Sequence, residues 1–154
     1  MGDYMKLSKK LFYLFFPLVL GSFVGFIISG NIDYKELLKP PLAPPSWLFP
    51  VMWTIIYLLM GISYYLLKKD YEDFGIIDIL YYVQLGVNLL WSIIFFVFKL
   101  RLFACWWIIL LDILVGIMLY CFCKIKKVSG YLNILYMVWI LFATYLTIGI
   151  YILN

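Results

Sequence analysis

Residues 79–98 read ILYYVQLGVNLLWSIIFFVF, which is 20 consecutive positions without a charged side chain. A helix that crosses a bilayer needs about 20 mostly apolar residues, because the hydrocarbon core is roughly 30 Å thick. Other uncharged runs cover residues 11–32, 40–67 and 128–154, and residues 102–123 form a further run that only Asp112 interrupts. The spacing of the charges therefore predicts five membrane-crossing segments in a single domain of residues 1–154.

The composition of the 154 residues excludes most classes of soluble protein. Apolar residues make up 67% of the chain and charged residues 13%, whereas a soluble domain carries about 25% charged residues. The chain has no histidine, which excludes a Ser-His-Asp triad, a histidine metal site and a histidine haem ligand. We expect no metal site, and the odd number of cysteines, three, predicts no disulfide framework.

The expected fold is an all-α integral membrane protein. Backbone groups in lipid must be hydrogen-bonded within a helix or a closed barrel. A barrel strand alternates apolar and polar residues, but residues 93–98 read IIFFVF. We therefore predict an antiparallel bundle of five transmembrane helices, with a proline-rich loop between the first and the second. Their approximate ranges are 10–30, 47–68, 76–98, 102–124 and 128–152.

The basic residues suggest an orientation in the membrane. One side of the predicted bundle carries eight lysines and the other side carries four basic residues. The eight are Lys6, Lys9, Lys10, Lys68, Lys69, Lys124, Lys126 and Lys127, and the four are Lys35, Lys39, Lys99 and Arg101. The positive-inside rule places the N-terminus in the cytoplasm. The composition favours a bacterial plasma membrane, and a net charge of +4 gives no reason to expect a nucleic-acid partner.

The connection between the first two predicted helices is the least lipid-like part of the chain. Residues 31–39 could form a short interfacial helix, which the two proline pairs of residues 40–45 cannot continue. The prolines instead predict a stiff extended stretch over one mouth of the bundle. Two interpretations stay open: a lid over a site or a spacer.

Three helix faces could enclose a flat ligand slot. Their members recur at steps of three and four residues: Gln84, Asn88, Trp91 and Phe95 on one face, Trp53, Tyr57, Met60 and Tyr64 on another, and Trp139, Ala143 and Leu146 on the third. Amides at membrane depth need partners, so the face that carries Gln84 and Asn88 should point inward. A slot edged by N–H and O–H groups would suit a planar apolar ligand. The alternative is plain helix packing with interfacial tryptophans.

Two further features have both a structural and a functional interpretation. Gly21 and Gly25 form Gly-x-x-x-Gly, which serves either dimerisation or internal packing. Asp112 is an acid deep in a predicted span, and it is either a functional carboxylate or a partner in a structural hydrogen bond.

Several motifs resemble the TspO/MBR family of translocator proteins. Residues 39–47 read KPPLAPPSW and are followed by Trp53-Thr54, Tyr57 and Met60-Gly61, similar to the family's loop and second helix. Residues 84–96, QLGVNLLWSIIFF, and residues 139–146, WILFATYL, resemble its third and fifth helices. Three positions differ from the usual family residues: Leu42 for Trp, Leu135 for Pro and Thr147 for Asn.

The resemblance implies a five-helix protein, commonly a homodimer, that binds porphyrins such as protoporphyrin IX and haem under the loop. The implied pocket includes Tyr34, Trp47, Trp53, Asn88, Trp91, Phe95, Trp139, Ala143 and Leu146, and the helix faces add Tyr57 and Gln84. The porphyrin would be a ligand, and no cofactor is required.

Three functions remain open at this point. The first is a porphyrin-binding sensor or transporter in the lipid bilayer. The second is an enzyme that degrades porphyrin in light and oxygen, with Trp53 and Trp139 as the catalytic candidates. The third is a small lipid- or stress-related membrane protein whose aromatic residues only pack.

Overall fold

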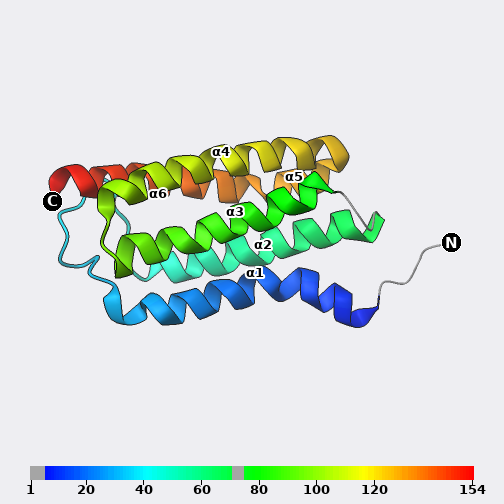
Figure 1. The fold of residues 1–154 in the computed structure, drawn as a ribbon, viewed down its shortest axis with the longest axis horizontal. Coiled ribbons are helices and arrows are strands. Elements are labelled where there is room, and N and C mark those ends of the chain that lie inside the picture. The colour runs from blue at the N-terminus through cyan, green and yellow to red at the C-terminus, as the bar shows by residue number, and fades with distance from the viewer. Residues whose placement is uncertain (1–5, 71–74) are drawn as a thin grey trace.

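The computed structural model describes residues 6–70 and 75–154, and within these ranges the regular structure is helical throughout (Figure 1). The elements are α1 (Leu7–Ile28), η1 (Ser29–Asn31), α2 (Leu48–Asp70), α3 (Ile76–Ser92), η2 (Ile93–Val97), α4 (Arg101–Ile125), α5 (Lys127–Leu132) and α6 (Ile134–Leu153). They form five spans long and apolar enough to cross a membrane. The prediction of an all-α, five-helix membrane protein is confirmed.

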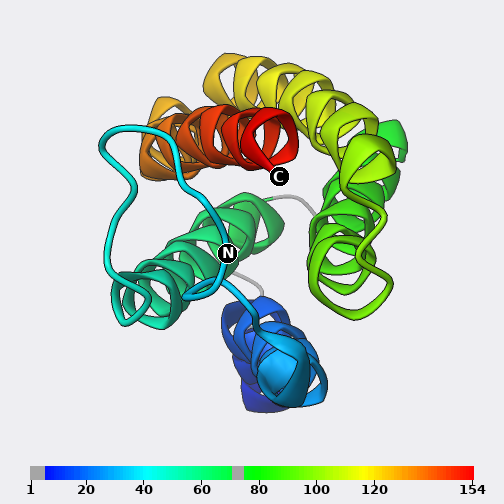
Figure 2. The ribbon, with the colours of Figure 1, turned by 90° about the vertical axis from the view of Figure 1, so that its left-hand side faces the viewer.

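The five spans run side by side and alternate in direction, so that α1 begins and α6 ends at opposite ends of the bundle (Figure 1). Viewed along the bundle, they form a ring in the order α1, α2, α6, α4, α3 (Figure 2). The α1–α2 pair packs closely because Gly61 of α2 lies directly against the backbone carbonyl of Leu14, where a Cβ atom would overlap. The ring surrounds a central space that is packed at one end and hollow at the other.

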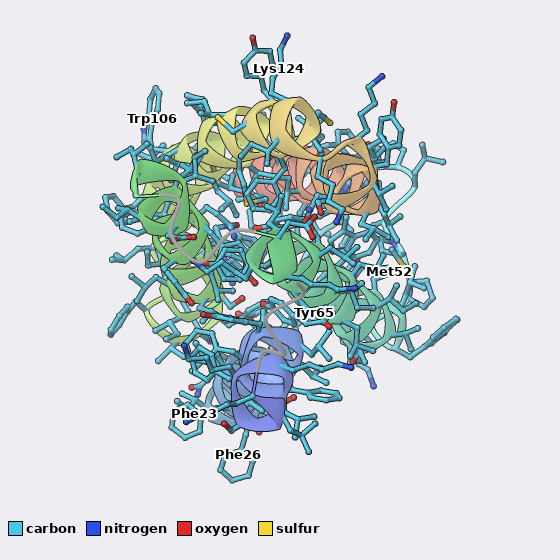
Figure 3. All side chains as sticks on the ribbon, turned by 90° about the vertical axis from the view of Figure 1, so that its right-hand side faces the viewer. Phe23, Phe26, Met52, Tyr65, Trp106 and Lys124 are labelled. Carbon is cyan, nitrogen blue, oxygen red and sulfur yellow. The ribbon has the colours of Figure 1, made fainter. Side chains whose placement is uncertain are left out.

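The outside of the bundle is apolar. Phe23 and Phe26 project outward from α1, and Trp106 projects outward from α4 (Figure 3). The side chain of Phe26 is 80% exposed. Water would not tolerate so much exposed apolar surface on a monomer, so the surroundings of these helices are a lipid bilayer.

The fifth span is broken, although the sequence predicts one helix over 128–152. Asn133 lies between α5 and α6 with φ −95° and ψ 0°. Its side-chain amide donates hydrogen bonds to Ser63 Oγ (2.6 Å) and to the carbonyl of Ser129 (2.9 Å). This polar contact joins the break to α2, because Ser63 belongs to α2.

Residues 32–47, which we call the covering loop, cross the end of the bundle between α1 and α2 (Figure 2). The short helix that the sequence allowed over 31–39 is not formed; only the 3-10 turn at Ser29–Asn31 and a turn at residues 34–36 are present. The Lys39 ammonium donates to the carbonyls of Tyr34 (3.0 Å) and Leu37 (2.9 Å). In a helix, these two carbonyls would accept hydrogen bonds from backbone N–H groups of the next turn. Here they accept hydrogen bonds from the Lys39 side chain instead.

Candidate ligand site

A cavity of about 670 Å³ lies beneath the covering loop. Its walls come from α1, α2, α3, η2, α6 and the loop itself, so it is closed only when all of these elements are assembled. The volume is typical of a pocket for one small organic molecule.

Aromatic rings form much of the cavity wall. Seven line it: Tyr34, Phe49, Trp53, Tyr57, Trp91, Phe96 and Trp139. The rings of Trp53 and Tyr57 are nearly parallel, with centroids 5.5 Å apart and planes at 24°. Phe49 stands edge-on to both Tyr34 (5.0 Å) and Trp139 (5.9 Å). Rings held in this way by their neighbours present fixed flat faces to a ligand.

The cavity wall on α1 includes small residues, Gly21, Ser22 and Gly25, together with Leu18, Val24 and Ile28. A Cβ atom at Gly21 would overlap the ring of Tyr57, so this glycine serves internal packing between α1 and α2. Gly25, one turn further along α1, has no neighbouring atom within 4 Å of the same position and lines the cavity. The Gly-x-x-x-Gly pair thus brings two helices together at one position and leaves room at the other.

Two tryptophans that line the cavity have an indole N–H group without an acceptor among the described residues. Trp91 and Trp139 both line the cavity and are more than nine-tenths buried. The Nε1 atom of each makes no hydrogen bond within residues 6–70 and 75–154. A buried donor without an acceptor is costly, so a ligand that offers an acceptor to either group would be stabilised.

The π-helical turn η2 decides which phenylalanine faces the cavity. The backbone N–H of Phe98 donates to the carbonyl of Ile93, five residues back, at 3.1 Å. With the longer repeat of this turn, Phe96 and Trp91, five residues apart, both line the cavity. Phe95 is buried beside it, where its ring packs against Trp91 (5.4 Å) and under Arg101 (4.7 Å). The α-helical spacing of the sequence pattern predicts that Phe95 lines the cavity, and it does not identify Phe96, which does.

The amides of α3 are used by the protein itself. Tyr57 donates a hydrogen bond to Asn88 Oδ1 (2.8 Å), and Asn88 Nδ2 donates to the hydroxyl of Tyr136 (3.0 Å). Tyr136 in turn donates to Gln84 Oε1 (2.8 Å). All four side chains are buried. This chain, which we call the tyrosine–amide network, ties α2, α3 and α6 together and holds Tyr57 against the cavity.

The covering loop is fastened at several points along its length. Pro40 packs on Gly149 of α6, and the hydroxyl of Tyr145 donates to the carbonyl of Pro41 (2.7 Å). The side chain of Asn154 bonds both the N–H (3.0 Å) and the carbonyl (2.9 Å) of Leu38. These contacts hold the loop on the end of α6.

Tyr34 belongs to the covering loop and lines the cavity below it. Its hydroxyl donates to the carbonyl of Pro44 (2.9 Å) across the loop. Burial raises the pKa of the Tyr34 phenol above its ordinary value of 10.0, so the group stays a neutral donor at physiological pH.

The structure brings six of the eleven predicted ligand-binding residues to the cavity wall: Tyr34, Trp53, Tyr57, Trp91, Trp139 and Ala143. Gln84, Asn88, Phe95 and Leu146 are buried but do not line it. Trp47 is 64% exposed and also lies outside it. Contact between a ligand and any of the eleven residues stays a prediction.

Asp112 and the three positions that differ from the family pattern all lie outside the cavity wall. Asp112 accepts a hydrogen bond from the Thr144 hydroxyl at 2.8 Å, which is the structural role considered for it. Thr147 bonds the carbonyl of Ala143 within its own helix at 2.7 Å, Leu135 is exposed on α6, and Leu42 is 85% exposed on the loop. Residues 6–70 and 75–154 contain no cluster of three or more Cys, Asp or Glu suited to a metal ion.

Comparison with known proteins agrees with this architecture. The family model described as "TspO/MBR family" matches residues 13–153. The chain is 33% identical to "Tryptophan-rich protein TspO" of Archaeoglobus fulgidus over 97% of this chain and 99% of that protein. It is 35% identical to the protein of the same name from Chlorobaculum tepidum, over 79% and 78%. It is 31% identical to "Tryptophan-rich sensory protein" of Cereibacter sphaeroides, over 78% and 75%.

Proposed function

The chain belongs to the TspO/MBR family of membrane proteins, and from that premise we propose that it binds porphyrins, such as protoporphyrin IX or haem, in the cavity under the covering loop. In this proposal the protein acts as a sensor or transporter of such planar ligands. The name "sensory protein" of the Cereibacter relative supports this direction. The porphyrin is the ligand, and binding needs no other cofactor.

The observation that carries the proposal is the cavity. Its seven aromatic rings offer flat apolar faces, and the indole N–H groups of Trp91 and Trp139 have no acceptor in the described part of the chain. Porphyrins combine a large flat ring with polar groups at its edge. Stacking on fixed aromatic faces and hydrogen bonding to orphaned donors both favour such a molecule over a flexible lipid chain.

We further propose the setting in which the protein works. The eight lysines at the end away from the covering loop favour a cytoplasmic N-terminus in a bacterial plasma membrane. The covering loop and the cavity mouth then lie on the outer side. A homodimer is the proposed assembly, by analogy with the family.

The degrading enzyme is the second candidate, because both candidate tryptophans line the cavity. Trp53 stacks on Tyr57, and Trp139 stands edge-on to Phe49. Both indoles would therefore lie beside a bound porphyrin. Excited porphyrin and oxygen would supply the reactivity, and the protein would supply orientation and containment.

Purified protein titrated with protoporphyrin IX in detergent, with tryptophan fluorescence as the signal, tests binding directly. We expect saturable quenching at one porphyrin per chain. Illumination of the complex then separates the two candidates: an unchanged porphyrin spectrum favours sensing or transport. New absorption bands that disappear in Trp53→Phe or Trp139→Phe favour degradation. If quenching is not saturable, the third function, a membrane protein without a porphyrin site, is the correct one.

Substitution at Ala143 tests whether the cavity is the site. Ala143 is buried at the cavity wall, so Ala143→Phe should fill the space and lower porphyrin affinity at least tenfold. Val138→Phe on the lipid-facing side of the same helix is the matched control and should bind normally. Equal binding by both variants would place the site elsewhere.

A further inference from the structure

Four basic side chains belong to the loop end of the bundle, and three of them have structural partners. Arg101 and Lys99 both pair with Asp33, at 2.7 and 3.3 Å. The ammonium of Lys39 donates to backbone carbonyls of the covering loop and lies 5.1 Å from the centre of the Tyr34 ring. Arg101 and Lys39 fasten the loop, whereas Lys99, whose side chain is 54% exposed, only adds to the pairing of an Asp33 that Arg101 already holds.

Lys35 is the exception. It lines the cavity, and its ammonium makes no hydrogen bond or ion pair within the described residues 6–70 and 75–154. No acidic side chain lines the cavity in that part of the chain. Asp33 is already paired with two cations, and Glu36 is exposed and does not line the cavity. The wall of an otherwise uncharged cavity therefore carries one uncompensated positive charge, on the covering loop.

We propose that Lys35 is the residue that selects anionic ligands, by pairing with a ligand carboxylate at the mouth of the cavity. The proposal rests on the proposed function and deepens it, because it makes the ligand class an anionic planar amphiphile. The carboxylate end would lie at the covering loop, and the flat ring would lie inward among Trp53, Trp91 and Trp139. A charge-assisted hydrogen bond beside apolar walls is stronger than one in bulk water.

The arrangement accounts for two otherwise separate observations. Apart from Lys35, the side chains that line the cavity are uncharged, and two of them, Trp91 and Trp139, carry an indole N–H group without an acceptor in the described residues. These suit neutral acceptors within a ring system or at its edge. The one full charge lies at the loop, where water can still reach the headgroup of a ligand. A molecule that is charged at one edge and apolar elsewhere matches both ends of the cavity.

Protoporphyrin IX, which carries two carboxylates, and its uncharged dimethyl ester form the test pair. The unsubstituted protein should bind the diacid about tenfold more tightly than the ester. Lys35→Gln should remove that preference by weakening the diacid alone, and Lys35→Glu should reverse it. Lys35→Arg should restore the preference, because it restores the charge. Lys99→Gln removes one positive charge at the same end but away from the cavity wall, and it should change either affinity less than twofold.

The outcomes separate this inference from the proposed function. If the unsubstituted protein binds neither porphyrin saturably, the proposed function itself fails and this inference fails with it. If it binds both equally, or if Lys35→Gln and Lys99→Gln weaken the diacid by the same factor, only the role of Lys35 is overturned. Circular dichroism and gel filtration of each variant establish that it is folded, and the ester affinity provides a second check in the same preparation.

Discussion

The two ends of the bundle are built from the same kinds of residue and differ in how these residues pack. At the end away from the covering loop, the rings of Tyr64 and Tyr81 stack 3.8 Å apart with planes at 3°, and Tyr13 packs edge-on against Tyr64. There Asp78 accepts a hydrogen bond from the Tyr64 hydroxyl at 2.7 Å and pairs with Lys68 at 2.8 Å. At the loop end, seven aromatic rings also contact one another but line a cavity of about 670 Å³.

The difference shows that aromatic content does not by itself make a binding site. Tyrosines that stack on one another satisfy their faces internally and stabilise the bundle. Around the cavity, Gly25 leaves space open, and the indole N–H groups of Trp91 and Trp139 find no acceptor within residues 6–70 and 75–154. We therefore expect substitutions at the packed end to change stability and substitutions at the hollow end to change the proposed ligand binding.

The largest expected effect comes from alanine at the two glycines that represent the two environments. Gly61→Ala places a Cβ atom against the backbone carbonyl of Leu14, so we expect a loss of about 3 kcal/mol in the free energy of unfolding. Gly25→Ala meets no atom within 4 Å and should leave stability unchanged or raise it by up to about 1 kcal/mol. Denaturant titration in mixed micelles measures both, and equal losses would show that the two environments do not differ.

A smaller effect is expected at Tyr57, where the cavity meets the tyrosine–amide network. Tyr57→Phe removes the donor to the buried Asn88 Oδ1 and should lower the free energy of unfolding by about 1–2 kcal/mol. The ring remains, so porphyrin affinity should change less than threefold. Tyr145→Phe, which removes an exposed hydrogen bond to Pro41, is the control and should cost less than about 0.5 kcal/mol. A larger loss of affinity than of stability would make the Tyr57 hydroxyl a ligand contact.

The fastening of the covering loop predicts a kinetic effect. Gly149→Ala places a Cβ atom 2.6 Å from Pro40 Cγ, which should lift the loop and raise the dissociation rate of a bound porphyrin about fivefold, with little change in the melting temperature. Gly116→Ala of α4, whose nearest neighbour would be Met137 Cε at 3.9 Å, is the control. Stopped-flow fluorescence measures both rates, and identical rates would mean that the loop does not gate the cavity.

The smallest expected effect is at Leu42, which lies in the turn closed by the N–H of Ala43 and the carbonyl of Pro40 (3.3 Å). Leu42 has φ 67°, a left-handed conformation that suits Asn better than a branched aliphatic side chain. Leu42→Asn should therefore raise stability by up to about 1 kcal/mol, measured as an increase in melting temperature. Leu38→Asn, another exposed leucine of the loop without a positive φ, should give no increase.

The sequence predicts the spans well because charges and prolines mark their ends in an otherwise apolar chain. It does not predict the break at Asn133, since one amide in an apolar run shows no sign of its partners Ser63 and Ser129. The expected helix over 31–39 fails for a similar reason, because Lys39 binds carbonyls that a helix would have needed. At the break, a contact between residues far apart in the chain overrides the local pattern. At residues 31–39, contacts of the Lys39 side chain with nearby carbonyls override it.

The candidate site is predicted in part. Helical spacing identifies Trp53, Trp91, Trp139 and Ala143, which line the cavity. It also selects Gln84 and Asn88, whose amides pair with Tyr57 and Tyr136. Tyr136 has a usable signal, since it precedes Trp139 by three residues on the same helix face. Phe49 and Lys35 have none, because the path of the covering loop is needed to place them.

The turn η2 has a consequence for the length of the chain between α3 and α4. A π-helical turn accommodates one residue more than an α-helical turn, and each residue of an α-helix advances the chain by about 100° around its axis. Deleting one residue between Ile93 and Val97 and restoring regular α-helix would keep the residues beyond the turn on the same faces relative to Trp91, because the wider turn absorbs the extra residue. A chain shortened by one residue in this turn should therefore fold and keep an aromatic ring beside Trp91 at the cavity wall, provided that a phenylalanine then stands four positions after Trp91.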